Sequence, residues 1–207
     1  MTKIITITAL FICSLLSAQT KFEENMTKSL SLWEEGKPTE AAALMERIAA
    51  VEKTNWLPNY YVALINITEG VNPANKDKVA AMLEKSQSAL DQASSISTNN
   101  PEIMVAQALL YTVKIVQDPM TNGMKYSPMV MDIYSKAQLI APENPRVVFS
   151  KADFEMGGAR WTGADVNKLC LEIDRSITLF KDFKSEVPFY PDWGLKRAQE
   201  SLKNCKK

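Results

Sequence analysis

The chain has 207 residues, 46% of them hydrophobic and 23% charged, and its 24 Lys and Arg residues balance its 24 Asp and Glu residues. This composition fits one folded domain or one compact array, and without a basic excess we do not expect nucleic acid as a partner. The chain also has no histidine, which excludes Ser-His-Asp and Cys-His catalysis and removes the commonest ligand for transition metals. We therefore expect no catalytic residues, no metal site and no cofactor.

The N-terminus is typical of a secretory signal peptide. A short basic start at Met1–Lys3 precedes a mostly apolar run, Ile4–Leu16, which is too short to span a bilayer. Small residues follow, so we predict a signal peptide over 1–18 with cleavage after Ala18. The alternative is a lipoprotein anchored to the outer membrane through Cys13, but the bulky Ile12 before that cysteine favours a soluble product.

The rest of the chain is predicted to be helical. Apolar residues recur at helical spacing, Gly and Pro separate the segments, and alternating Val, Ile and Thr runs typical of strands are missing. We expect loops at 118–126 and 157–163 and an extended segment at 184–191, where two prolines prevent regular helix. The predicted helices are 21–36, 39–53, 59–69, 76–96, 101–117, 127–140, 145–156, 164–183 and 192–204.

The helix starts recur along the chain. Pro58, Pro101 and Pro145 each begin a helical stretch, at intervals of 43 and 44 residues. A fixed period of this size indicates a stacked array of repeats, in which each helix pair buries its apolar face against its neighbours. Such an array displays a surface and implies no particular reaction.

Within these repeats the chain resembles the tetratricopeptide-repeat (TPR) family. The best match is the run 137–146, with Ala137 as the small residue at the helix crossing and Pro142 at the pair boundary, and 33–41 looks like the turn of a leading repeat. The resemblance implies an all-α, right-handed array of antiparallel helix pairs (a TPR-like α-solenoid) of about nine helices over 19–207, capped by 191–207. The period exceeds the family's usual length of about 34. Further small residues at expected crossings are Ala50, Ala93, Ala108 and Ala152; Ile65 departs from the pattern.

By analogy with that family, the first helix of each pair lines a concave groove. In this sequence the groove would present a mixed polar and apolar strip, as a peptide-binding surface does. Its candidate binding residues are Asn59, Val62, Asn66, Glu69, Glu102, Val105, Leu109, Arg146, Phe149 and Asp153.

Two cysteines remain after the predicted leader. Cys170 lies early in one predicted helix and Cys205 near the end of the last, so antiparallel packing of the two helices would bring them together. An even pair in an exported chain is compatible with one disulfide. The alternative is two free thiols.

Three other features have structural interpretations. The glycine-rich run 157–163 lacks the Lys and Ser or Thr of a phosphate-binding loop, so we expect a turn with Trp161 packed on the array. The methionines between 120 and 131 are expected to fill the core. Most of the aromatic residues Trp56, Tyr60, Tyr61 and Trp193 are expected to be buried.

These observations favour a non-enzymatic scaffold or adaptor, exported to the periplasm or the cell exterior, that binds another protein or a peptide. The alternative is a ligand-binding or accessory subunit of a cell-envelope complex, with contact to the membrane only if Cys13 is lipidated. A hydrolase that uses only Asp and Glu is the third and least favoured interpretation.

Overall fold

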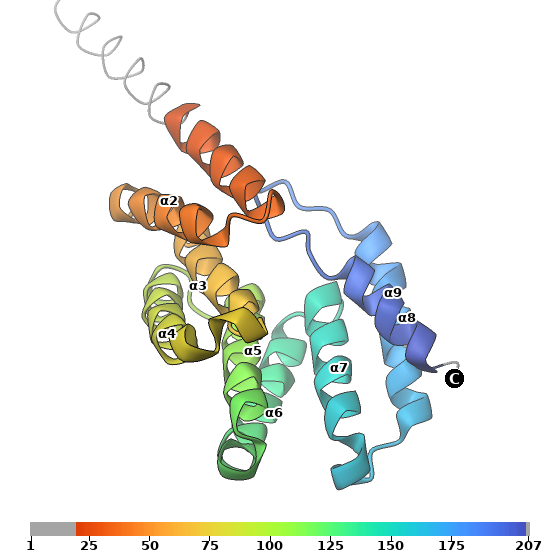
Figure 1. Ribbon diagram of the computed structural model, residues 1–207. Helices are drawn as coiled ribbons and strands as arrows, with labels where there is room; N and C mark the ends of the chain where they lie inside the picture. Colours follow the sequence, from red (N-terminus) through yellow and green to blue (C-terminus); the bar gives the residue numbers. More distant parts are fainter. Residues whose placement is uncertain (1–19, 206–207) are drawn as a thin grey trace, which may run out of the picture.

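The computed structural model describes residues 20–205, which form nine α-helices and no strand (Figure 1). The predicted signal peptide, 1–18, and Cys13 lie outside the described residues. After a first helix at 20–34, the chain continues through α2 (Pro38–Val51), α3 (Leu57–Glu69), a 3-10 turn η1 (Pro73–Lys78), α4 (Val79–Ile96), α5 (Pro101–Gln117), α6 (Pro119–Ile140), α7 (Pro145–Thr162), α8 (Val166–Asp182) and α9 (Leu195–Cys205).

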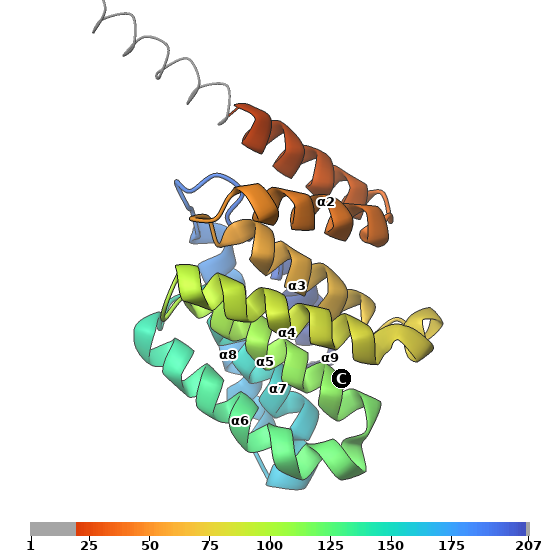
Figure 2. The ribbon, with the colours of Figure 1, turned by 90° about the vertical axis from the view of Figure 1, so that its left-hand side faces the viewer.

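The helices form an array of antiparallel pairs. The most extensive packing joins α5 to α6, α3 to α4 and α7 to α8, and Figure 2 shows the helices stacked in chain order from the first helix to α6. The predicted fold class, an all-α helix-pair array, is therefore confirmed.

The repeated Asn-Pro pair starts its helices by the same local chemistry. Asn100 Oδ1 accepts a hydrogen bond from the backbone N–H of Glu102, and Asn144 Oδ1 accepts from that of Arg146, each at 2.9 Å. The proline that follows each asparagine occupies the first helical turn, where its missing N–H has no intrahelical partner to lose. The sequence alone is thus sufficient to fix where α5 and α7 begin.

Small residues lie at most of the expected helix crossings. Ala93, Ala108, Ala137 and Ala152 are fully or almost fully buried, as close approach of two helices requires. Ala50 was a wrong prediction, because it is exposed and its neighbour Ala49 is buried instead.

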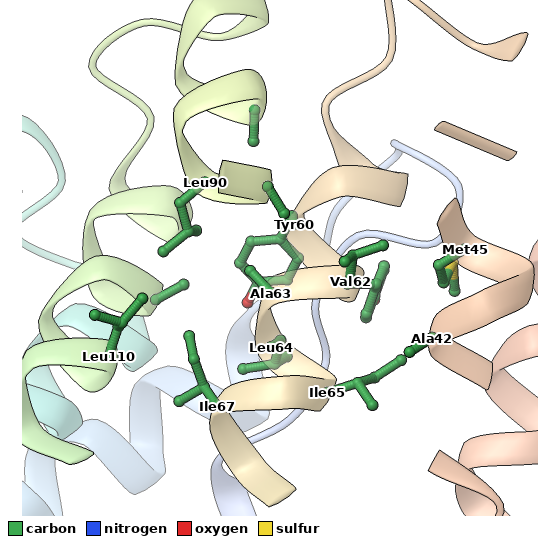
Figure 3. Packing of buried hydrophobic residues seen from close by; sticks show 14 of the residues in the cluster. Ala42, Met45, Tyr60, Val62, Ala63, Leu64, Ile65, Ile67, Leu90 and Leu110 are labelled. Carbon is green, nitrogen blue, oxygen red and sulfur yellow. The ribbon is translucent and has the colours of Figure 1, made fainter. Parts of the chain in front are cut away.

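The main core is built around α3. Figure 3 shows its apolar side chains between Ala42 and Met45 of α2 on one side and Leu90 and Leu110 on the other. Every residue of α3 from Leu57 to Ile67 is buried. A helix that is apolar on all sides must pack against other elements on all sides. The C-terminal part of the chain covers the face of α3 that the neighbouring repeats leave open.

Two predicted loops are helical. Residues 119–126 belong to α6, because Asp118 Oδ1 accepts from the backbone N–H of Thr121 at 3.1 Å and Pro119 begins the helix. Residues 157–162 extend α7, which ends only at Gly163, in a left-handed conformation with φ of 70°. Glycine inside a helix costs only about 1 kcal/mol relative to alanine, so Gly123, Gly157 and Gly158 do not by themselves end these helices.

The segment 183–194, here called the return segment, leaves α8 and crosses back to the start of the array (Figure 1). The Phe189 ring meets Phe22 of the first helix edge to face at 5.9 Å, and Tyr61 Oη donates a hydrogen bond to the Phe189 carbonyl at 2.9 Å. Trp193 Nε1 donates to Tyr60 Oη at 2.8 Å. The last part of the chain therefore contacts the first helix and α3, whereas a simple array joins only neighbours.

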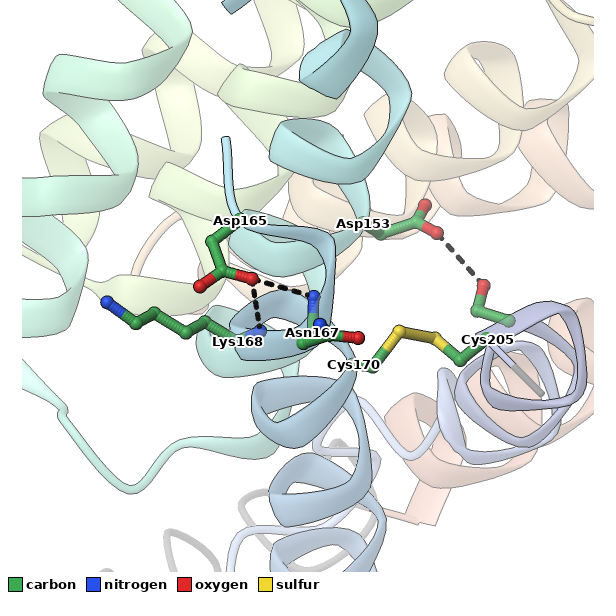
Figure 4. Close-up of a disulfide and its surroundings, with 7 residues drawn as sticks. Asp153, Asp165, Asn167, Lys168, Cys170 and Cys205 are labelled. Carbon is green, nitrogen blue, oxygen red and sulfur yellow. Dashed lines mark hydrogen bonds between the residues drawn. A yellow bond between two sulfur atoms is a disulfide. The ribbon is translucent and has the colours of Figure 1, made fainter. Parts of the chain in front are cut away.

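The final helix, α9, is joined to α8 by a disulfide and to α7 by polar contacts. Cys170 of α8 and Cys205 of α9 are joined in a disulfide, with a Cα–Cα distance of 5.9 Å (Figure 4). Arg197 and Ser201 of α9 both reach the Asp153 carboxylate of α7, at 2.7 and 2.9 Å. The predicted cap at 191–207 thus corresponds to α9 and the end of the return segment.

Candidate ligand-binding site

A cavity of about 650 Å³ lies where the return segment meets the array. Its walls come from the end of the first helix, the start of α3, the start of α7, the end of α8 and the return segment itself. Seven of its lining side chains are aromatic: Trp33, Tyr61, Phe180, Phe183, Phe189, Tyr190 and Trp193. The volume and the apolar lining are typical of sites that hold a small organic molecule.

The aromatic walls are held by one another and by hydrogen bonds. Trp33 and Tyr61 meet edge to face at 6.5 Å, and the Phe183 and Tyr190 rings lie 5.8 Å apart. Trp56 contacts Tyr190 at 6.0 Å from outside the lining. These contacts fix the positions of rings from segments far apart in the sequence.

One residue of the lining, Arg146, belongs to a buried ion pair. Arg146 Nε donates to Glu102 Oε2 at 2.7 Å, and the other carboxylate oxygen accepts from Asn144 Nδ2, also at 2.7 Å. Both charged side chains are almost inaccessible to solvent. The two residues follow the prolines that begin α5 and α7, so the stacking of equivalent positions in successive repeats creates the pair.

Arg146 has a further donor that is not used. Its guanidinium lies 4.7 Å from the centre of the Phe183 ring and 5.7 Å from that of Tyr190, and Nη2 is buried without a hydrogen-bond partner. Burial opposes the charge, but the hydrogen bond and ion pair with Glu102 outweigh it and raise the pKa of Arg146 above its ordinary value. Arg146 therefore remains a cation with one free donor at a cavity wall.

The tyrosines of the site are held neutral. Burial raises the pKa of Tyr61 and of Tyr190 well above the ordinary value, and nearby carboxylates add to the shift, Asp192 for Tyr61 and Glu102 for Tyr190. Burial also raises the pKa of Tyr60. All three phenols keep their protons near neutral pH and act as neutral polar groups.

The return segment has an unusual backbone at two positions. Phe189 adopts a positive φ of 61°, a conformation that costs a bulky residue of order 1–3 kcal/mol, and Gly194 has φ of 117°. The Tyr61 hydrogen bond to the Phe189 carbonyl holds the first of these in place. Strain of this kind is found most often at binding sites and at segments that move.

The ten residues predicted for a concave groove lie mostly in the interior. Seven are buried and three are half-buried; the half-buried ones are Glu69, Leu109 and Asp153. The C-terminal part of the chain contacts two of the ten, since Arg197 of α9 binds Asp153 and the Phe183 ring of the return segment stacks on Arg146. Of the ten, only Glu102 and Arg146 form an ion pair with each other. Because most of the ten are buried, they do not together form an exposed surface, and the peptide groove stays a prediction. The buried seven are Asn59, Val62, Asn66, Glu102, Val105, Arg146 and Phe149.

A second, shallower groove of about 530 Å³ lies between α2 and α4 above α3. Asn59 and Val62 of the predicted set line it, and the ion pair between Lys85 and Glu46 spans it at 2.7 Å. Its other walls are mainly alanine, serine and charged side chains, so it offers little apolar surface to a ligand.

Sequence reasoning missed lining residues at the end of α8 and in the return segment. Phe180, Phe183, Phe189 and Tyr190 were assigned no role, although the aromatic content of 180–193 is far above the 8% of the whole chain. This local density of aromatic residues was the signal that could have identified the segment as part of a binding site. Of the four aromatic residues expected to be mostly buried, Tyr60 and Tyr61 are buried, and Trp56 and Trp193 are half-buried. Tyr60 contacts both Trp56 and Tyr61 at 5.3 Å and accepts the Trp193 hydrogen bond.

The start of α6 and the end of α7 expose apolar side chains that were expected to be buried. Met120 and Met124 are each 89% exposed, and Trp161 is 78% exposed with the Arg160 guanidinium 4.5 Å from its ring centre. The predictions that these methionines fill the core and that Trp161 packs on the array were therefore wrong. They lie on the two helix extensions that the sequence had suggested were loops.

Two further properties concern the described part of the chain. No helix between residues 20 and 205 combines the length and the apolar character needed to cross a bilayer. Within the same range, His, Cys, Asp and Glu side chains do not gather in threes that could hold a metal ion.

No protein-family model matches the sequence, and no curated protein is recognisably similar to it. Among solved structures, the chain is similar to the HusA haemophore from Porphyromonas gingivalis, with a TM-score of 0.78 and 23% sequence identity. The likeness covers 89% of this chain and 92% of that one, and at this identity it establishes the shared helical fold.

Proposed function

We propose that this chain is an exported, non-enzymatic protein that binds a small, flat, largely aromatic molecule in the cavity beneath the return segment. The observation that carries the proposal is the convergence of seven aromatic side chains around about 650 Å³ of space. Flat rings stack on aromatic side chains, and a cavity of this size can enclose most of a drug-sized ligand.

Haem is the first ligand to test, because the neighbour in fold is described as a haemophore. A porphyrin is flat and apolar at its centre and carries acidic groups at one edge, which matches an aromatic cavity with an arginine in its lining. The likeness also supports export and a TPR-like arrangement of the repeats, both of which remain proposals.

Iron coordination would contribute little to such a complex. The chain has no histidine, and the cavity is lined by neither methionine nor cysteine. The lining tyrosines Tyr61 and Tyr190 are held as neutral phenols, which are poor iron ligands. We therefore expect iron-free protoporphyrin IX to bind within about threefold of haem, since ring contacts supply the affinity.

Tryptophan substitution tests both the ligand and its place. Trp33→Ala removes a side chain that lines the cavity, whereas Trp161→Ala removes an exposed ring at the end of α7. Titration with haem and with protoporphyrin IX, followed by absorbance, should show affinity reduced at least about tenfold by Trp33→Ala and unchanged by Trp161→Ala.

Two results would contradict this proposal. Absence of saturable binding by the unmodified protein would remove the porphyrin class. Loss of binding in Trp161→Ala with normal binding in Trp33→Ala would place the site near the exposed Trp161 instead.

A second candidate function is protein–protein interaction, for which the exposed Met120, Met124 and Trp161 are the favouring observation. Large exposed apolar side chains often mark contact surfaces. If this function holds, Met124→Glu should weaken recovery of a specific partner crosslinked in the cell-envelope fraction, while Met45→Leu, a buried change of similar size, should leave it intact. A lipid anchor at Cys13 also remains a proposal.

A further inference from the structure

We infer that the ligand carries a carboxylate, or an equivalent anionic oxygen, which accepts a hydrogen bond from Nη2 of Arg146. This inference rests on the proposed function and specifies the chemical class of the ligand. It starts from a single unsatisfied group: within residues 20–205, Arg146 Nη2 is the one buried side-chain donor that lacks a hydrogen-bond partner.

A buried donor without a partner is uncommon in a folded protein and calls for an acceptor. Arg146 lines the cavity, and only 1% of its side chain is accessible to solvent. Glu102 and Asn144 hold the guanidinium from one side through Nε and the carboxylate network, so its orientation is fixed before any ligand binds. The unused donor is thus preorganised for an acceptor.

The chemistry of the guanidinium favours an anionic acceptor. Arginine donates charge-assisted hydrogen bonds to carboxylates, which are stronger than those to neutral carbonyls. Phe183 and Tyr190 stack on its face in the present structure, at 4.7 and 5.7 Å from their ring centres. A flat ligand ring that displaces either side chain can take over the stacking contact while its carboxylate reaches Nη2.

The remaining charges of the cavity limit the ligand to few acidic groups. Glu34, Glu186 and Asp192 also line it, and the charge of Arg146 is already balanced by Glu102. These three carboxylates repel a polyanion such as a nucleotide. The structure therefore fits a flat aromatic acid that directs one carboxylate inward and keeps other anionic groups in solvent.

A pair of probes that differ only at the carboxylate tests the inference. Protoporphyrin IX and its dimethyl ester have the same ring, and we expect the full-length mature protein to bind the acid at least about tenfold more tightly. In the double variant Glu102→Met/Arg146→Met, the ratio of the affinities for acid and ester should fall to about one. Replacing both members of a buried pair avoids leaving an unpaired charge.

Two further variants keep the test decisive. Glu46→Met/Lys85→Met removes an ion pair of the same 2.7 Å length from the other groove and should retain the preference for the acid. If the first double variant does not fold, Glu102→Gln/Arg146→Met keeps an acceptor for Asn144 and still removes the guanidinium, and it too should lose the preference.

The outcomes separate this inference from the proposed function. Equal binding of acid and ester by the unmodified protein overturns the inference and leaves the function standing. Preference for the acid that survives in the Arg146 variants also overturns it, because another group must then receive the carboxylate. If neither probe binds, the proposed function fails and the inference fails with it.

Discussion

Glu102 and Arg146 occupy the same position in successive repeats, one residue after the proline that begins each helix, and their side chains meet with Oε2 and Nε 2.7 Å apart. The sequence period therefore places opposite charges in contact, and one of them, Arg146, lines the cavity. Because the pair is buried, it links stability to the candidate site.

Breaking this pair on one side should destabilise the protein strongly. Glu102→Ala leaves the charge of Arg146 buried and unpaired, and we expect the free energy of unfolding to fall by about 3–5 kcal/mol. The double variant Glu102→Met/Arg146→Met should lose far less, because no charge remains. Urea unfolding followed by circular dichroism measures both; a double variant as unstable as the sum of its single changes would contradict the prediction.

Glycine substitutions should have opposite effects in the return segment and in α7. An added Cβ at Gly194, where φ is 117°, would lie 2.5 Å from Cζ of Phe180, so Gly194→Ala should destabilise by more than about 1 kcal/mol. At Gly157, inside a helix with nothing within 4 Å, alanine should stabilise by about 0.5–1 kcal/mol. Melting temperatures that shift in the same direction for both would show that the return segment is not held as described.

The disulfide should contribute substantially to stability. Cys170 and Cys205 are 35 residues apart, and closing a loop of this length in the unfolded chain is worth about 3–4 kcal/mol on the chain-entropy model. Cys170→Ala/Cys205→Ala should lower the urea midpoint by a corresponding amount. In protein without residues 1–18, thiol reagents under denaturing conditions should detect no thiol before reduction and two after it; two thiols before reduction would show that the bond is absent.

Alkaline pH should unfold the protein through its buried tyrosines. Burial raises the pKa of Tyr60, Tyr61, Tyr134 and Tyr190, so the folded state keeps phenol protons that the unfolded state releases above about pH 10. Their contribution to stability is complete below that pH and is lost as pH rises towards the folded-state values. Urea unfolding between about pH 8 and 11 should show this decline, and Tyr134→Phe should make it shallower. An unchanged slope in that variant would indicate that other groups control the decline.

Processing of the N-terminus should distinguish the two modes of export. Cleavage after Ala18 gives a soluble protein beginning at Gln19, whereas a lipoprotein would begin at a modified Cys13. We expect the intact mass of the exported protein to match the chain from Gln19. A mass that corresponds to a lipid on Cys13 would instead establish the anchored form.

The elements that sequence reasoning found are those determined locally. Asn100 and Asn144 cap their helices through neighbouring backbone groups, so the repeat boundaries could be predicted without knowing the fold. The start of α6 and the end of α7 were missed because Pro119, Gly123 and Gly157 usually interrupt helices. Here Pro119 follows the Asp118 cap at the first turn of α6, and α7 continues through its glycines to the C-cap at Gly163.

The candidate site could not be predicted in the same way. Its walls depend on contacts such as Tyr61 with Phe189 and Tyr60 with Trp193, which join residues 128 and 133 positions apart. Local patterns carry no information about such pairings. The Glu102–Arg146 pair is an intermediate case, since residues 44 apart in an array with a period of 43–44 can be expected to be neighbours once the stacking is accepted.

Because the return segment packs against the first helix and α3, the two ends of this array are in contact. An ordinary solenoid can lose a terminal repeat, or gain one, while the rest stays folded. Here, deleting the first helix would remove packing contacts of the return segment, and deleting the return segment would expose buried residues of α3. The chain should consequently melt in one cooperative step, without fraying inward from either terminus.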